Sequence, residues 1–224
     1  MNENIVKKFD TIFSVYKSER WSKNFWENRF ESWENDTFEF MNKYLDKNKT
    51  FIDIGAWIGP MSLYASYHSK KCISFEPDPV ASFEFQNNIN INNLSNIVLE
   101  KKAISIHDKI NLGASEWGHS VTRIGVADNS FSADCLSIKQ ILDNFNLNES
   151  NISLIKIDIE GHEVELLTDE NLKKLNVPMH ISFHPGWSSN KDEFFHKILP
   201  FLLAKNFDLN NYPHEKSFFE LTFE

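Results

Sequence analysis

The segment Leu154–Glu160 alternates charged and apolar residues, and its charged side chains are the ones best suited to chemistry. Lys156, Asp158 and Glu160 are separated by single isoleucines, and in a β-strand this spacing places all three side chains on one face. Because charged groups in a buried strand are costly unless they are paired, Lys156 is expected to neutralise a carboxylate. Asp158 or Glu160 is therefore a candidate for general acid–base chemistry.

A histidine ends a second apolar segment, Val177–His184, which is expected to be another strand. At the carboxyl end of a strand, His184 is placed to act as a base or as a metal ligand, whereas His180 is expected to be structural. Two carboxylates and a histidine form only a partial ligand set for a divalent cation. Proton transfer without a metal is the first expectation, and a cation bound by Asp158, Glu160 and His184 is the alternative.

A turn bounded by two glycines, Gly55–Gly59, follows the apolar run Phe51–Ile54 and precedes a helical pattern. This strand–turn–helix arrangement is where α/β folds receive a nucleotide-like ligand. A dinucleotide site needs a glycine where Trp57 stands, and Asp53 would repel a pyrophosphate. The turn therefore favours a cationic, phosphate-free cofactor, S-adenosylmethionine (SAM), over NAD.

Glu76 ends the next expected strand, Lys71–Glu76, at about 20 residues past the glycine turn, where such folds place a carboxylate on the ribose. A carboxylate can accept hydrogen bonds from two neighbouring hydroxyl groups at once. Beyond the following strand, Asn96–Leu99, the adenine pocket is expected around Lys101–Ala103.

These segments together predict an α/β fold with a mostly parallel sheet. Helices are expected over Met61–His68, from the N-cap Asp78 to about Asn92, over Leu136–Phe145, and over Lys191–Ala204. Asp208–Tyr212 and Ser217–Phe223 are expected to form a closing antiparallel hairpin.

Two regions are less regular. Residues 1–48 are rich in Trp and Phe at helical spacings, which favours helices packed on one edge of the sheet over a lid on the substrate pocket. Ile104–Asp134 contains glycines and serines that predict short strands and turns, with Trp117 and His119 placed to reach a substrate.

Composition limits the classes of function. The 224 residues suit one domain, 1–224, and the formal net charge of −9 argues against nucleic acid as a partner. No apolar run is long enough to span a membrane, and the first residues do not resemble a signal peptide. The two cysteines, Cys72 and Cys135, are expected to be buried thiols, so a cytoplasmic location is expected. The sequence carries no signal for an oligomeric state.

The strings FIDIGAWIG, ISFEPDP, NNININN and LIKIDIEGHEVELL together resemble the FkbM family of SAM-dependent methyltransferases over about residues 34–184. The first two strings are shared with many class I methyltransferases, and IKIDIEG is more specific to FkbM-like enzymes. The resemblance implies a Rossmann-like class I methyltransferase sheet with helices on both faces. It also implies methyl transfer to hydroxyl oxygens of polyketides, sugars or glycans.

By this resemblance, Asp53, Gly55 and Gly59 contact the methionine portion of SAM, and Glu76 contacts the ribose. The residues expected at the cofactor are Asp53, Gly55, Ala56, Trp57, Gly59, Glu76, Pro77, Lys102, Ala103 and Asp158. The residues expected at the chemical step are Asp158, Glu160, His162 and His184. The chain departs from the family pattern at His162, usually small or apolar, and at Ser182, usually glutamate.

The expected function is transfer of the SAM methyl group to a hydroxyl of a small molecule or saccharide, with Asp158, Glu160 or His184 as the base. Trp117 and Trp187 would suit stacking on a sugar ring. The N/D-P-P-Y/F string of many nucleobase methyltransferases does not occur. The alternatives are a SAM-binding module that has lost its chemistry, and an NAD-dependent oxidoreductase.

Overall fold

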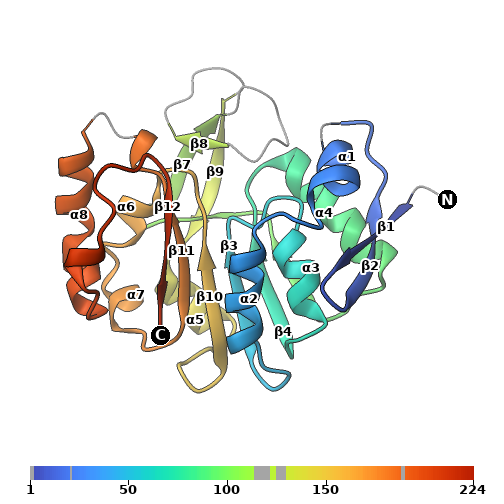
Figure 1. Cartoon of the computed structure of the whole chain (residues 1–224), viewed down its shortest axis with the longest axis horizontal. Helices are drawn as coiled ribbons and strands as arrows, with labels where there is room; N and C mark the ends of the chain where they lie inside the picture. The colour runs from blue at the N-terminus through green and yellow to red at the C-terminus, as the bar shows by residue number, and fades with distance from the viewer. Residues whose placement is uncertain (1–2, 21, 114–121, 125–129, 188–189) are drawn as a thin grey trace.

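A six-stranded sheet with the order β12-β11-β10-β3-β4-β5 forms the centre of the molecule (Figure 1). The computed structural model describes residues 3–20, 22–113, 122–124, 130–187 and 190–224. The strands of this sheet are β3 (Thr50–Ile54), β4 (Lys71–Phe75), β5 (Ile97–Glu100), β10 (Ile152–Ile157), β11 (Met179–Phe183) and β12 (Phe219–Phe223). All neighbours pair in parallel except β12, which runs antiparallel to β11. Strand order reverses between β3 and β10, and in such sheets a crevice opens at the carboxyl ends beside this point.

Helices cover both faces of the sheet, as predicted. One face carries α2 (Asn35–Tyr44), α3 (Pro60–Ser66) and α4 (Pro79–Ile91). The other carries α5 (Ile138–Asn144), α6 (Glu163–Leu166), α7 (Glu170–Lys174) and α8 (Lys191–Ala204).

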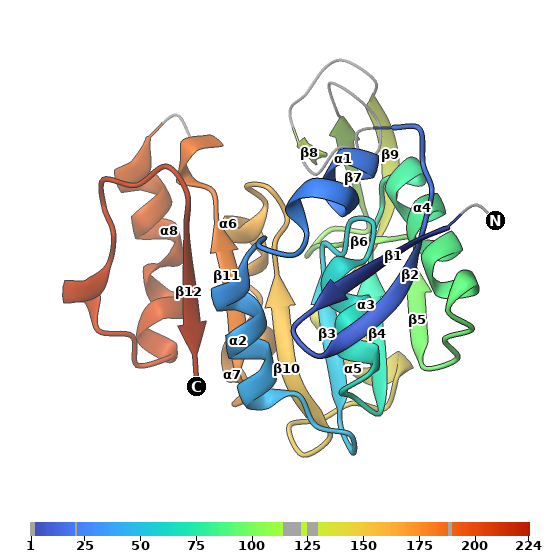
Figure 2. The ribbon, with the colours of Figure 1, turned by 45° about the vertical axis from the view of Figure 1, so that its right-hand side comes forward.

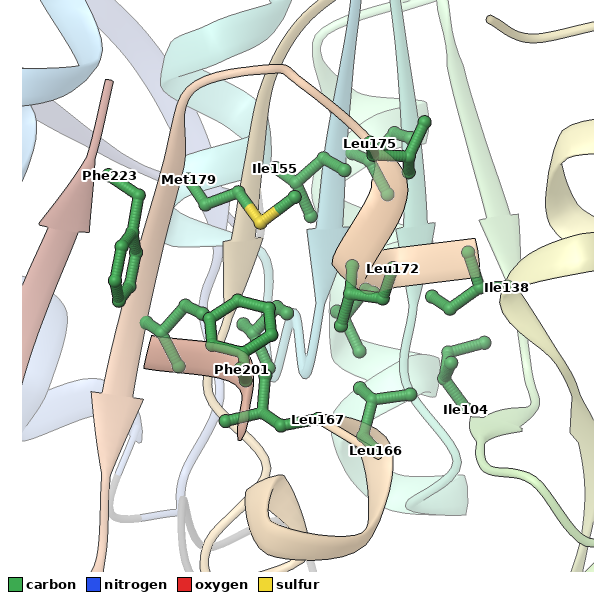
Figure 3. Packing of buried hydrophobic residues seen from close by; sticks show 14 of the residues in the cluster. Ile104, Ile138, Ile155, Leu166, Leu167, Leu172, Leu175, Met179, Phe201 and Phe223 are labelled. Carbon is green, nitrogen blue, oxygen red and sulfur yellow. The ribbon is translucent and has the colours of Figure 1, made fainter. Parts of the chain in front are cut away.

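Side chains alternate between the two cores along each strand. In β3, Phe51 joins the core under α2 and α3, whereas Ile52 and Ile54 join the opposite core. In this second core, strand residues such as Ile155 and Met179 meet helix residues such as Leu172 and Phe201 (Figure 3). Two apolar cores thus fix the sheet between two helical layers.

The first residues form a β-hairpin, so the prediction of helices there is wrong for this part. Strand β1 (Glu3–Lys8) pairs antiparallel with β2 (Thr11–Tyr16), next to α4 (Figure 2). In β2 the buried residues recur with a period of two, because Phe13 and Val15 face the core and Ile12 faces outward. Helical structure begins only with α1 (Ser22–Asn24) and the π-helical turn Phe25–Arg29 that follows it.

Asparagine side chains of α4 close the outer edge of β2. The Asn88 Oδ1 atom accepts a hydrogen bond from the backbone N–H of Tyr16 at 2.6 Å. Asn92 accepts from the N–H of Ser14 and donates to its carbonyl oxygen, at 2.8 and 2.6 Å. The outward-facing backbone groups of β2 are therefore hydrogen-bonded by side chains rather than by another strand.

The region after β5 folds as short strands, as predicted. They are β6 (Ala103–Ile104), β7 (Lys109–Gly113), β8 (Arg123–Ile124) and β9 (Ser130–Leu136). β7, β8 and β9 lie at the end of the molecule where the parallel strands finish (Figure 1). Trp117 and His119 lie outside the described residues.

Two predicted boundaries are corrected. The predicted C-terminal hairpin is wrong, because Leu209–Asn211 is a short 3-10 turn and β12 pairs with β11 instead. The strand predicted to carry Lys156, Asp158 and Glu160 on one face ends at Ile157, so Asp158 and Glu160 lie in the loop after β10. Among the helices that the structure describes, none has the length and apolar character to cross a membrane.

Candidate active site

One cavity at the carboxyl ends of β3, β4 and β10 gathers the residues that the sequence singled out. It measures about 1350 Å³ including its open mouth. The predicted residues that line it are Asp53, Gly55, Ala56, Trp57, Glu76, Pro77, Lys102, Ala103, Asp158, Glu160, His162 and His184. Gly59 is not among the lining residues, since it lies at the start of α3 with φ +88° against the ring of Phe85.

Gly55 permits a close approach of the two loops that meet at the crevice. Its φ is +84°, and a Cβ atom there would lie 1.8 Å from the carbonyl oxygen of Asp158. Only glycine fits this position, because both the backbone conformation and the space exclude a side chain. The turn after β3 is therefore pressed directly against the loop after β10.

Glu76 is oriented by the backbone on either side of it. Its Oε2 accepts from the N–H of Trp57 at 2.7 Å, and its Oε1 accepts from the N–H of Asp78 at 2.8 Å. Burial raises the pKa of Glu76 to about 8, although these two hydrogen bonds lower it. The carboxyl group is thus fixed beside the glycine turn.

Lys156 lies among carboxylates, as the sequence predicted. Its Nζ is 3.4 Å from Asp158 Oδ2 and 3.9 Å from Asp53 Oδ1, and it donates to the carbonyl of Gly55 at 3.3 Å. Burial lowers the pKa of Lys156, but the charges of Asp158, Asp53 and Glu34 outweigh it and raise the pKa. Lys156 is therefore a buried cation that links the loops after β3 and β10.

His184 contacts a buried carboxylate through one ring nitrogen, and its other ring nitrogen lies near two further carboxylates in the cavity. Its Nδ1 lies 2.9 Å from Oε1 of Glu163, which is fully buried. Its Nε2 lies 3.4 Å from Glu160 Oε2 and 3.7 Å from Asp158 Oδ1. Burial lowers the pKa of His184, but the hydrogen bond and charge of Glu163, with Asp158 and Glu160, raise it to about 9.

Glu160 has a left-handed backbone with φ +52°, which is uncommon for a residue other than glycine. Its Oε2 accepts a hydrogen bond from the indole N–H of Trp187 at 3.2 Å. Burial and the charge of Asp158 raise the pKa of Glu160 to about 7. Non-glycine residues with such backbones cluster at functional sites, and Glu34 and Trp57 share this conformation in the same cavity.

His162 lines the cavity, yet both of its ring nitrogens already have partners. Nε2 lies 3.2 Å from the hydroxyl of Ser105, and Nδ1 lies 3.3 Å from Glu165 Oε2. Burial lowers its pKa. This histidine is placed to fix the loop after β10 against β6 and α6.

The sequence did not single out several residues on the wall of the cavity. Four precede β3 and one precedes β12: Phe25, Arg29, Trp33, Glu34 and Phe218. The aromatic spacing of residues 1–48 does not indicate which side chains reach the cavity, because this depends on how the N-terminal segment folds back over the sheet. A lid of aromatic residues was the weaker alternative, and Phe25 and Trp33 do form part of the wall.

The fold and the cavity define the class of protein. An rRNA methylase from Streptococcus thermophilus aligns with a TM-score of 0.51 at 12% identity, covering 85% of this chain and 94% of that one. A Streptococcus mutans protein in complex with S-adenosylhomocysteine (SAH) aligns with a TM-score of 0.50 at 14% identity, covering 84% and 94%. The fold is that of a Rossmann-like class I methyltransferase.

The family follows from the sequence itself. The profile described as the Methyltransferase FkbM domain matches residues 53–209, so the chain belongs to the FkbM methyltransferase family. An FkbM methyltransferase structure from Methylobacillus flagellatus is also similar, with a TM-score of 0.45 at 16% identity, covering 71% of this chain and 38% of that one. No match was found among curated proteins. Family membership and the SAH-bound neighbour support SAM as the methyl donor.

Proposed function

We propose that this chain is a SAM-dependent O-methyltransferase that acts on a hydroxyl group of a small molecule or saccharide. The observation that carries the proposal is the Glu163–His184 pair, which turns Nε2 of His184 toward the cavity beside Asp158 and Glu160. A carboxylate on Nδ1 keeps the proton there, so a neutral His184 presents Nε2 as a base.

The cofactor would lie across the carboxyl ends of β3 and β4. Glu76 would accept from the ribose hydroxyls, and the turn Asp53–Gly59 would follow the methionine portion. Lys102 and Ala103, which line the far part of the cavity, would border the adenine. This placement directs the methyl group toward the loop after β10.

The reaction needs one bond to form and one to break. The acceptor oxygen attacks the methyl carbon, a C–O bond forms, and the C–S bond of the sulfonium breaks to leave neutral SAH. The acceptor proton passes to His184 Nε2, because an alcohol is a poor nucleophile until its proton is leaving. The protein otherwise acts by holding the two reactants in line.

Titration calorimetry with SAM, SAH and NAD⁺, followed by transfer of labelled methyl from SAM to a panel of methyl glycosides, tests the proposal. Binding of SAM and a methyl ether product are expected. Preference for NAD⁺ would favour an oxidoreductase, and SAM binding without transfer to any hydroxylated acceptor would favour a binding module.

A metal-assisted form of the same reaction has one geometric observation behind it. Ligand atoms of Asp158, Glu160 and His184 all lie within 4.8 Å of one another. A divalent cation there would acidify the acceptor hydroxyl directly. Loss of transfer with EDTA and its return with Mg²⁺ or Mn²⁺ would favour this form, whereas indifference to EDTA would remove it.

A further inference from the structure

Glu34 brings a carboxyl group into the cavity from outside the matched family domain. It lies at the start of α2, ahead of residues 53–209, and lines the cavity together with Asp53, Gly55 and Asp158. Its Oε2 is buried and, within the described part of the chain, has no hydrogen-bond partner. A buried oxygen without a partner is costly, so a ligand that donates to it would be stabilised.

Carboxyl groups outnumber cations at this end of the cavity. Asp158, Asp53 and Glu34 all act on the buried cation Lys156 and raise its pKa. Each also keeps one buried oxygen without a hydrogen-bond partner among the residues described, and Asp53 is 1% exposed. The turn at Gly55, whose carbonyl already accepts from Lys156, therefore offers acceptors for a second cation.

We propose that Glu34 binds the α-ammonium group at the amino-acid end of the cofactor. This inference rests on the proposed function, because the ligand is SAM or SAH. An ammonium presents three donors and no acceptor, which matches the three buried carboxyl oxygens, one each from Glu34, Asp53 and Asp158, that accept no hydrogen bond from the described residues. A bound ammonium would also stabilise the ionised form of Glu34, since burial, with the charges of Asp158 and Glu220, raises the pKa of Glu34 to about 8 against the effects of Lys156 and the Thr37 hydrogen bond.

Lys8 of the N-terminal hairpin holds Glu34 in place. Its ammonium group, 1% exposed, donates to the carbonyls of Phe30, Glu31 and Trp33 and to Asn35 Oδ1, at 3.2, 3.3, 2.6 and 2.6 Å. It also lies 4.4 Å from the ring centre of Phe38. These contacts bracket Glu34, whose φ of +47° is unfavourable for a residue with a Cβ and needs such support. Lys8 is thus a positioning residue that acts through Glu34.

The test compares two ligands that differ only at the amino-acid end. SAH carries the ammonium group, whereas 5′-methylthioadenosine keeps the adenosine and the sulfur but lacks the amino acid. Glu34→Gln is expected to weaken SAH roughly tenfold, because the ammonium–carboxylate pair becomes a hydrogen bond to a neutral amide, and to leave methylthioadenosine within about twofold. Glu31→Gln, the same change on an exposed side chain of the same turn, is expected to alter neither. Affinities come from calorimetry, with thermal unfolding as the check on folding.

Any other pattern of affinities for SAH and methylthioadenosine would contradict the assignment of Glu34 to the ammonium group. Equal weakening of SAH and methylthioadenosine would assign Glu34 a structural role, and unchanged affinity for both would remove it from the site. Glu34→Asn, which tolerates the left-handed backbone better, covers the case in which the glutamine variant folds poorly, and the same ratio is expected. If the wild-type protein binds neither SAH nor SAM, the proposed function itself fails, and this inference with it.

Discussion

Glu163 determines which nitrogen of His184 faces the cavity. It is fully buried, and besides contacting His184 Nδ1 it accepts hydrogen bonds from the backbone N–H groups of Ile159 and Gly161, at 3.2 and 3.0 Å. One carboxylate thus fixes both the imidazole and the loop that carries Glu160. A change at Glu163 should therefore alter the pH dependence of the reaction as well as its rate.

Glu163→Gln is expected to shift the pH profile of kcat/KM downward. A base must be neutral, so activity limited by His184 should rise with pH toward its pKa of about 9 and level off above it. Removing the Glu163 charge removes the main cause that raises this pKa, so the midpoint should fall. Methyl-transfer rates measured from about pH 6 to 10 check this, once an acceptor is known.

Glu165→Gln is the matched control, because Glu165 lies on the same helix and contacts His162 rather than His184. The midpoint of the pH profile of kcat/KM for Glu165→Gln should equal that of the wild-type protein. An unchanged midpoint in Glu163→Gln would mean that another group accepts the proton.

Residues with a motif and a spacing were predictable from the sequence. Asp53 lies near the end of β3, Glu76 and Asp158 directly follow β4 and β10, and parallel strands finish at one edge of a sheet, so their meeting in one cavity was predictable. Glu34 has no such signal, since a turn between two aromatic segments does not indicate which sheet edge it will reach. Glu163 follows His162 and looks like an ordinary residue of a first helical turn, and only the fold places it against Nδ1 of His184.

At the scale of elements, the N-terminal hairpin is a structural part of the active site. Lys8 connects it to the turn Phe30–Asn35, which supplies Trp33 and Glu34 to the cavity wall. The hairpin was mispredicted because Phe9, Ile12, Phe13 and Tyr16 recur at a helical spacing by chance. Likewise, the sequence predicted that the segment of β12 pairs with the nearby Asp208–Tyr212. Its true partner, β11, lies far away in the chain, and no local pattern indicates such a pairing.

Lys8→Met is expected to lower the free energy of unfolding by about 2–4 kcal/mol, because buried carbonyls lose their donor. Chemical denaturation measures this change. SAH affinity should also fall, since the turn that carries Glu34 is no longer held. Lys7→Met is the control, because Lys7 is an exposed neighbour on the same strand, and it should change neither quantity. If the folded Lys8→Met protein binds SAH with the affinity of the wild-type protein, the hairpin has no part in cofactor binding.

At the scale of the whole molecule, charge bears on the partner. Proteins bind a phosphate backbone largely through positive side chains that displace its counterions. A net charge of −9 disfavours this mode of binding. The fold neighbour that is an rRNA methylase shares 12% identity, which shows a common fold and leaves the acceptor to be determined.

The protein is expected to show no binding to a structured rRNA fragment at about 150 mM salt. Electrophoretic mobility shift with increasing protein is the measurement, and the same fragment with a basic RNA-binding domain is the positive control. Retardation that weakens as salt rises would contradict the saccharide proposal and direct the search to RNA.

The hydrogen bonds from α4 and its C-cap residue Asn92 to the edge of β2 form late when this chain folds during its synthesis. The ribosome makes β1 and β2 first, but the side chains that close the edge of β2 belong to Asn88 and Asn92. These hydrogen bonds therefore cannot form until residues 88–92 have emerged, although Phe13 can already pack against Trp26 and Phe30. Until then the backbone edge of β2 is open to pairing with another strand, so α4 protects the new chain against edge-to-edge association.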